Sequence, residues 1–147
     1  KVRRIDVHPW RVRLIHSMVT EQTPLSPVPW KDIIRFTQEQ YYSDPGPRYA
    51  QGWSMIYFLN TSKVVRRRPE WVAILPTYFT TLKESYAAGL AARADALSTP
   101  DHALDAREAA GAEARAAALE AAFEQVDLTE IDRVWRAFVA KLPVDRK

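Results

Sequence analysis

Residues 49–59 read YAQGWSMIYFL, and from Trp53 onward this stretch is apolar nearly all round when it is drawn as a helix. A helix with that pattern is buried on most of its sides, so the stretch predicts a buried helix over residues 47–60. Gly52 lowers the helix propensity by up to ~1 kcal/mol, which is tolerable where another backbone comes close. The preceding residues 43–47, SDPGP, have turn chemistry at every position and separate this helix from the one before it.

Further helical regions lie on both sides of this stretch. The spacing of apolar residues predicts helices over residues 9–22, 29–42 and 69–90 and from Asp127 onward. Pro76 lies inside the third of these and should kink or restart it, and Asp127 with Glu130 has the pattern of an N-terminal capping box. No sustained alternation of apolar and polar residues indicates a strand. We therefore predict an all-α fold, an irregular bundle of five or more helices.

The composition changes over residues 87–118, where about half of the residues are alanine. Residues 98–101, STPD, indicate a break followed by a new helix start. Alanine favours helix, but its small side chain buries little area. We expect residues 1–147 to form a single helical domain or subdomain in which residues 87–118 are an Ala-rich helical insertion. A solvated, weakly packed hairpin is favoured over a partner-docking arm.

Charge and composition exclude several classes of protein. The formal net charge is +3 and the basic residues gather mainly in residues 1–13 and 66–68. A nucleic-acid binder usually shows a larger basic face, so we expect no nucleic-acid partner and interpret residues 66–68 as a solvated loop. There is no cysteine, no apolar run long enough to span a bilayer and no targeting signal within the sequence. The chain begins with Lys1, so we expect a soluble piece that is processed or cut from something longer. The sequence does not indicate its cellular compartment.

The sequence shows no complete catalytic or metal-binding constellation. The three histidines, His8, His16 and His102, have no i, i+4 spacing, and there is no Gly-x-Ser-x-Gly elbow or phosphate-binding glycine loop. Asp105 and Glu108 lie in the Ala-rich stretch, where like charges at i, i+3 indicate a surface face. We therefore expect no metal ligand and no cofactor-binding residue in this chain.

Tyr49 is the candidate catalytic residue. It falls in the first turn of the predicted buried helix, where backbone donors are unpaired and the helix dipole is positive. A phenol placed there can donate a hydrogen bond to a developing oxyanion in a preorganised site. The alternative is a half-buried core tyrosine whose hydroxyl is satisfied within the fold.

Three segments together resemble the helical part of gluzincin-type zinc metallopeptidases and their bacterial relatives, some of which are domains of unknown function. They are residues 29–34 (PWKDII), 49–59 (YAQGWSMIYFL) and 123–139 (FEQVDLTEIDRVWRAFV). In that superfamily a Tyr-x-x-Gly opens an apolar helix downstream of the metal site. This chain departs from the aminopeptidases, which usually have charged residues between the tyrosine and the glycine, because it has Ala50 and Gln51 there.

The resemblance implies a function that this chain does not perform alone. It implies an upstream domain of the same protein that carries His-Glu-x-x-His and a further glutamate, and zinc is expected only in that domain. This chain would be the C-terminal helical subdomain that forms one wall of the active-site cleft. Tyr49 would be the transition-state hydrogen-bond donor, and the ligand would be a peptide or protein.

Two other hypotheses stay open. The chain could be a non-catalytic helical protein-interaction module that docks a partner through Trp10, Trp30 or Trp71, or through the Ala-rich arm. It could also be a basic nucleic-acid binder built around residues 66–68, although the small charge excess argues against this. Neither the substrate nor the oligomeric state follows from the residues.

Overall fold

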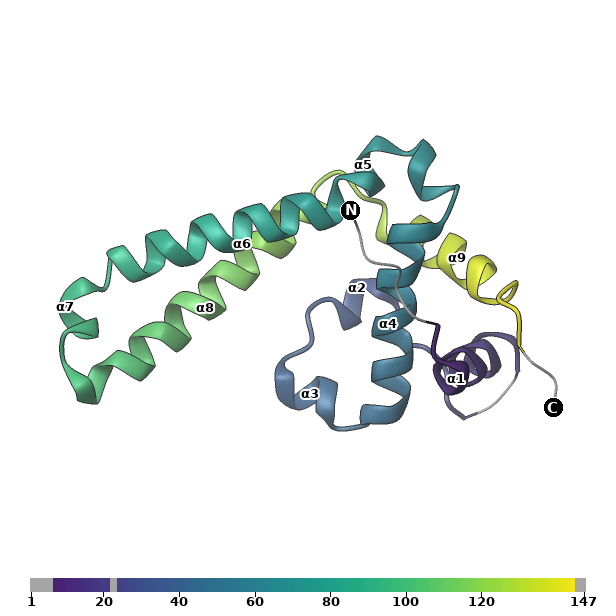
Figure 1. Ribbon diagram of the computed structural model, residues 1–147, viewed down its shortest axis with the longest axis horizontal. Helices are drawn as coiled ribbons and strands as arrows, with labels where there is room; N and C mark the ends of the chain where they lie inside the picture. Colours follow the sequence, from purple (N-terminus) through teal and green to yellow (C-terminus); the bar gives the residue numbers. More distant parts are fainter. Residues whose placement is uncertain (1–6, 22–23, 145–147) are drawn as a thin grey trace. The chain divides into compact units, whose positions relative to one another are not determined.

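The computed structural model describes residues 7–21 and 24–144. Over these residues the chain forms α-helices and one short 3-10 helix with no strand, which confirms the predicted all-α class. The chain divides into two compact units. Unit 1 comprises Lys1–Arg68 and Asp127–Lys147, and unit 2 comprises Pro69–Val126. Figure 1 labels the helices of both units.

Unit 1 is built around α4 (Pro45–Thr61), which contacts α1 (Pro9–Thr20), α3 (Gln38–Tyr42) and α9 (Leu128–Val139). Its other elements are α2 (Trp30–Ile33) and the 3-10 helix η1 (Val65–Arg67). The ring of Trp30 meets the rings of Phe58 and Trp135 edge-on, with centroids 6.2 and 6.3 Å apart, an arrangement that aromatic pairs prefer. All three side chains are almost fully buried. The apolar helix predicted over residues 47–60 is therefore the centre of the unit (Figure 1).

The single helix predicted over residues 29–42 is wrong, because the structure divides it into α2 and α3. The Thr37 hydroxyl accepts a hydrogen bond from the Gln40 backbone N–H at 3.2 Å, and the Gln40 side chain accepts one from the Thr37 N–H at 2.9 Å. This reciprocal capping box starts a new helix at Gln38 and competes with continuation of the earlier one. Apolar spacing alone places Thr37 on the apolar face of one long helix. In the structure its hydroxyl instead accepts a hydrogen bond from the backbone N–H of Gln40.

Gly52 lies where another group comes close to α4, as predicted, but that group is a side chain and not a backbone. A Cβ atom at Gly52 would collide with the hydroxyl of Tyr41. That hydroxyl donates a hydrogen bond to the Arg48 carbonyl oxygen at 2.9 Å. The glycine that weakens α4 therefore allows α3 to dock on it and places Tyr41 beside the start of α4.

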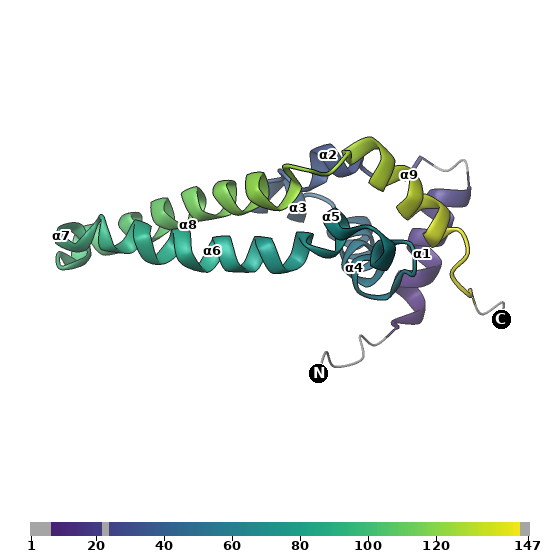
Figure 2. The ribbon, with the colours of Figure 1, turned by 90° about the horizontal axis from the view of Figure 1, so that it is seen from above.

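Unit 2 is a helical hairpin in which α6 (Ile74–Ala91) and α8 (Pro100–Phe123) lie side by side, joined by α7 (Ala94–Leu97) (Figures 1 and 2). The buried face of α8 consists of alanines at every fourth position, namely Ala106, Ala110, Ala114, Ala118 and Ala122. A Cβ atom on Gly89 would lie 3.0 Å from that of Ala110, so the two helices approach closely there. The small side chains of residues 87–118 therefore permit a close helix pair, where weak packing was the expectation.

Prolines mark the helix starts of unit 2 as the sequence predicts. The region over residues 69–90 restarts, because α5 (Pro69–Val72) and α6 separate at Ala73 and Pro76 is the third residue of α6. Pro100 likewise opens α8 after the predicted break. A proline is tolerated in a first turn because its missing N–H has no intrahelical partner there.

The chain leaves unit 1 after Arg68 and returns to it at Asp127. The Asp127 carboxylate caps α9 and accepts hydrogen bonds from the N–H groups of Thr129 and Glu130 at 2.9 and 3.0 Å. The Glu130 side chain pairs with Arg68 at 3.1 Å and with Arg133 at 2.8 Å. Arg68 is the last residue of unit 1 before unit 2, and Glu130 follows soon after the chain returns. Their ion pair therefore links the two segments of unit 1 on either side of the inserted unit 2.

Candidate functional site

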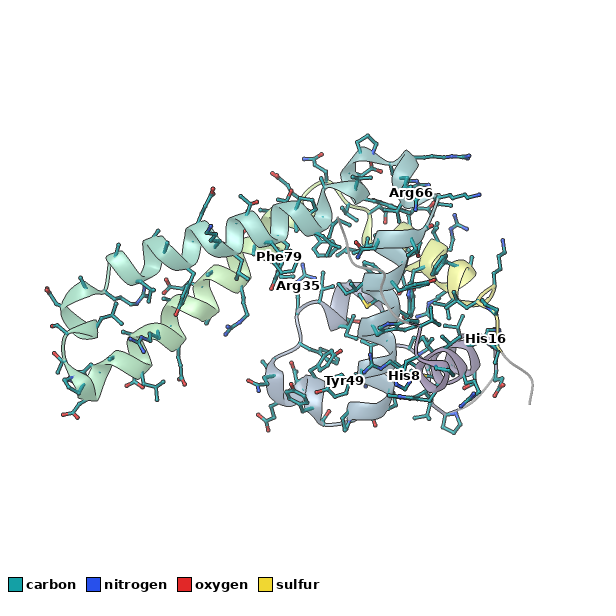
Figure 3. All side chains as sticks on the ribbon, in the orientation of Figure 1. His8, His16, Arg35, Tyr49, Arg66 and Phe79 are labelled. Atoms are coloured by element: carbon teal, nitrogen blue, oxygen red, sulfur yellow. The ribbon has the colours of Figure 1, made fainter. Side chains whose placement is uncertain are left out.

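Tyr49 lies on the side of α4 that faces α3, as Figure 3 shows, and 40% of it is exposed. Because α4 begins at Pro45, two residues before the predicted start, Tyr49 is its fifth residue and lies just past the first turn. Its phenol is at the surface of unit 1 and available to a ligand. A half-buried tyrosine whose hydroxyl is satisfied within the fold stays an alternative for this position.

Three tyrosines surround one another at this surface. The ring centroids of Tyr41 and Tyr49 lie 5.8 Å apart, those of Tyr42 and Tyr49 5.9 Å, and those of Tyr41 and Tyr42 6.0 Å. The capping box that starts α3 and the glycine in α4 bring these rings together, because they place α3 against α4. Of the three, only Tyr49 is a site residue predicted from the sequence. The pair Tyr41-Tyr42, directly before the turn that leads to Tyr49, is the signal in the sequence for the other two.

The environment raises the pKa of two of these phenols, those of Tyr49 and Tyr41. A side-chain hydrogen bond with Tyr42 raises the pKa of Tyr49 above its usual value, and partial desolvation adds to this. Burial raises the pKa of Tyr41, with the neighbouring Tyr42 as the second cause. A protonated phenol can donate a hydrogen bond, which is what stabilisation of an oxyanion requires.

Two arginines accompany the tyrosines. The charges of both Arg11 and Arg48 act on Tyr41, and that of Arg11 also acts on Tyr49. In each arginine the Nε atom is buried and has no hydrogen-bond partner, and neither side chain forms an ion pair with an acidic residue in the described part of the chain. Their guanidinium groups lie over the rings of Trp10 and Phe36, at 5.5 and 5.6 Å from the centroids. Neither arginine is among the site residues predicted from the sequence.

The segments that carry the resemblance meet inside unit 1. The Gln51 side chain bonds to both backbone groups of Val28, accepting at 3.0 Å and donating at 2.6 Å. The Ser54 hydroxyl accepts a hydrogen bond from the Trp135 indole at 3.2 Å, and the Trp30 N–H donates to Asp132 at 3.1 Å. Residues 29–34, 49–59 and 127–139 are therefore joined in unit 1 by polar contacts as well as by the aromatic core, and Gln51 also holds Val28, the residue before the first segment.

Ala50 and Gln51 lie inside unit 1. Both residues are fully buried, and Gln51 satisfies the backbone of the connector at Val28. Charged side chains at these two positions would lose their hydration without a partner, which is costly. The residues between Tyr49 and Gly52 thus serve the interior of unit 1, and only Tyr49 reaches its surface.

The other residues considered from the sequence do not form a site. His8 and His102 are exposed, and His16 lies near the hydroxyl of Thr20. Within residues 7–21 and 24–144, no three histidine or acidic side chains gather in a way that could hold a metal ion. Asp105 and Glu108 are both exposed on α8.

The arginine run at residues 66–68 is divided by the structure. Arg66 and Arg67 are exposed at η1, while Arg68 pairs with Glu130 (Figure 3 labels Arg66). Hydrogen bonds from Arg133, and secondly from Arg68, lower the pKa of Glu130 to about 2. Over the described residues, no helix is long and apolar enough to cross a membrane.

Comparison with known proteins returned nothing similar: no family model, no curated protein and no solved structure matches this chain.

Proposed function

We propose that this chain is the C-terminal helical part of a zinc-peptidase-like protein, in which unit 1 forms one wall of the active-site cleft. The zinc-binding half would lie upstream, and this chain would not be catalytic alone. The observation that supports the proposal most directly is the contact of all three resembling segments, through the hydrogen bonds of Trp30 with Asp132 and of Trp135 with Ser54. Segments far apart in the sequence that carry one family pattern are expected to pack together if the pattern reflects a shared scaffold.

Tyr49 is the residue of this chain that we assign to the chemistry. When zinc is bound in the upstream half, it supplies polarisation of the substrate carbonyl and activation of a water molecule. The contribution of Tyr49 is a hydrogen bond from its protonated hydroxyl to the oxygen on which negative charge develops. Its exposure on α4 and its raised pKa are both consistent with this role.

Two measurements on the longest natural protein that contains this segment test the proposal. The zinc content should be near one ion per chain, as in a single peptidase site with three protein ligands. The substitution Tyr49→Phe should lower turnover by roughly ten- to a thousandfold, the scale of losing one oxyanion donor. Tyr86→Phe, a partly exposed tyrosine on α6, is the matched control and should leave turnover unchanged. Unchanged turnover in Tyr49→Phe would overturn the role of Tyr49.

A non-catalytic protein-interaction module is the second candidate. Trp30 and Trp71 are buried and cannot dock a partner, whereas Trp10 is 40% exposed. In unit 2, Phe79 and Leu104 are exposed by 62% and 65% (Figure 3 labels Phe79), and exposed large apolar side chains favour binding surfaces. A well-folded parent protein without zinc would place this candidate first. A monomer that binds no partner would count against it.

A further inference from the structure

Arg11, Arg48, Tyr41, Tyr42 and Tyr49 form one surface of unit 1, here called the Arg–Tyr cluster. Its members come from α1, α3 and α4. The three rings contact one another, and the two arginines act electrostatically on them. Tyr42 and Tyr49 are exposed by 50% and 40%, so the cluster is open to solvent on one side.

Among the described residues, no acidic side chain forms an ion pair with the two arginines of the cluster. Each arginine has a buried Nε atom without an acceptor. Asp44 is the nearest acidic residue in sequence to Arg48 and forms no ion pair with it. The Tyr41 hydroxyl is already used on the Arg48 carbonyl oxygen, and the phenols of Tyr42 and Tyr49 share a hydrogen bond, so the free donors of the cluster are those of the arginines. The Nε atoms are buried, so a ligand would bind the terminal nitrogens of the two guanidinium groups, and an anion seated there would form charge-assisted hydrogen bonds with them.

We propose that the Arg–Tyr cluster binds the carboxylate of a peptide, from either an acidic side chain or a C-terminus. A guanidinium group is a planar fork that matches a carboxylate, and the charge-assisted bonds it makes are about twice as strong as neutral ones. The exposed rings beside it suit a ligand that carries apolar atoms next to its charge, as a peptide does and inorganic phosphate does not. The inference rests on the proposed function and narrows its substrate class to peptides with a carboxylate near the bond that faces Tyr49.

The test is an NMR titration of the full chain with two probes that differ only in charge, N-acetylphenylalanine and N-acetylphenylalanine amide. The acid should shift the signals of the Arg11 and Arg48 side chains in a saturable way, and the amide should not. The affinity for the acid should fall as sodium chloride is raised, because salt screens exposed charges. Inorganic phosphate is the third probe and should bind more weakly than the acid.

Substitutions locate the site. Arg11→Gln and Arg48→Gln should each weaken binding of the acid by about tenfold or more, the scale of one hydrogen bond to a charged group. Arg66→Gln removes the same charge from an exposed position of unit 1 and should leave the affinity unchanged. Arg11→Lys keeps the charge but loses the fork, so it should weaken binding less than Arg11→Gln. Circular dichroism shows whether each variant is folded. If Arg48→Gln does not fold, Arg11→Lys still tests the site.

Three results would overturn the inference: equal binding of acid and amide, tighter binding of inorganic phosphate, or the same loss of affinity in Arg66→Gln as in the cluster variants. None of these measurements requires zinc or turnover. If the acid fails to bind while the parent protein contains zinc and depends on Tyr49, only the carboxylate site is lost. If the acid binds and the parent has neither zinc nor activity, the proposed peptidase function is lost and the site stands as a binding surface.

Discussion

Unit 1 and unit 2 are stabilised in opposite ways. In unit 1, large rings from distant parts of the chain meet, and the hydrogen bond from Trp30 to Asp132 joins residues 102 positions apart. In unit 2, two helices that lie close together in the sequence, α6 and α8, pair through an alanine face. A buried aromatic side chain removes about 150–250 Å² from water, whereas an alanine contributes a single methyl group. Stability in unit 1 is therefore concentrated in a few side chains, and in unit 2 it is spread along a helix pair.

The largest effect is expected from Trp135→Ala. This change removes a fully buried ring from the core of unit 1 and leaves the Ser54 hydroxyl without its indole donor. It should lower the free energy of unfolding by about 3–5 kcal/mol, measured by urea denaturation. Trp10→Ala, at a partly exposed position of the same unit, should change it by no more than about 0.5 kcal/mol. A loss below about 1 kcal/mol in Trp135→Ala would contradict a core concentrated in a few rings.

A smaller effect is expected when the alanine face of unit 2 is overpacked. Ala110 is fully buried opposite Gly89, so Ala110→Leu forces α6 and α8 apart and should cost about 1–3 kcal/mol. Ala112→Leu places the same side chain on an exposed position of α8 and is the control, expected to be close to neutral. Thermal unfolding followed by circular dichroism compares the two. Equal stabilities would show that the close approach at Gly89 does not matter for the hairpin.

Local signals in the sequence account for most of the fold. Apolar spacing predicts α1, α4 and α9, and prolines predict the starts of α6 and α8, because each of these signals acts within a few residues. Thr37 shows where such reasoning fails, since its place in an apolar stripe hides a hydrogen bond that breaks the helix. A spacing pattern cannot tell whether a threonine side chain faces a core or its own backbone.

The candidate site is less predictable than the fold. Tyr49 follows from its position at the start of an apolar helix, but Arg11 lies 38 positions earlier in the sequence. Only the packing of α1 against α4 brings it to the tyrosines. Long-range pairs of this kind depend on how helices pack, and one sequence contains no direct record of that packing.

A third test concerns the residue at which the chain returns to unit 1. Asp127 caps α9 through two backbone N–H groups, so Asp127→Ala should cost about 0.5–2 kcal/mol of unfolding free energy. Asp127→Asn keeps a good capping oxygen, so its free energy of unfolding should fall by only a few tenths of a kcal/mol. Chemical denaturation measures both. If the two variants are equally destabilised, the charge of Asp127 rather than its capping geometry stabilises α9.

The smallest effect is expected at Glu130, whose ion pairs hold unit 1 together beside the insertion of unit 2. Its pKa is lowered from 4.5 to about 2 in the folded chain, with the hydrogen bond from Arg133 as the first cause. A group with a depressed folded pKa stabilises the fold above its unfolded pKa and loses that contribution as the pH falls through the folded value. Glu130→Gln should therefore be less stable than the natural chain at neutral pH, and the difference should shrink between pH 4.5 and about 2.

The matched control for this comparison is Glu120→Gln, which removes an exposed carboxylate from α8 in unit 2. The Glu120 carboxylate forms no ion pair with a described residue, so the stability of this variant should follow that of the natural chain across the same pH range. Salt should reduce the effect of Glu130→Gln, because pairs this exposed are screened. A stability difference that is independent of pH would mean that Glu130 acts through packing of its side chain. In that case the ion pair with Arg68 would not be what stabilises unit 1 at the site where unit 2 is inserted.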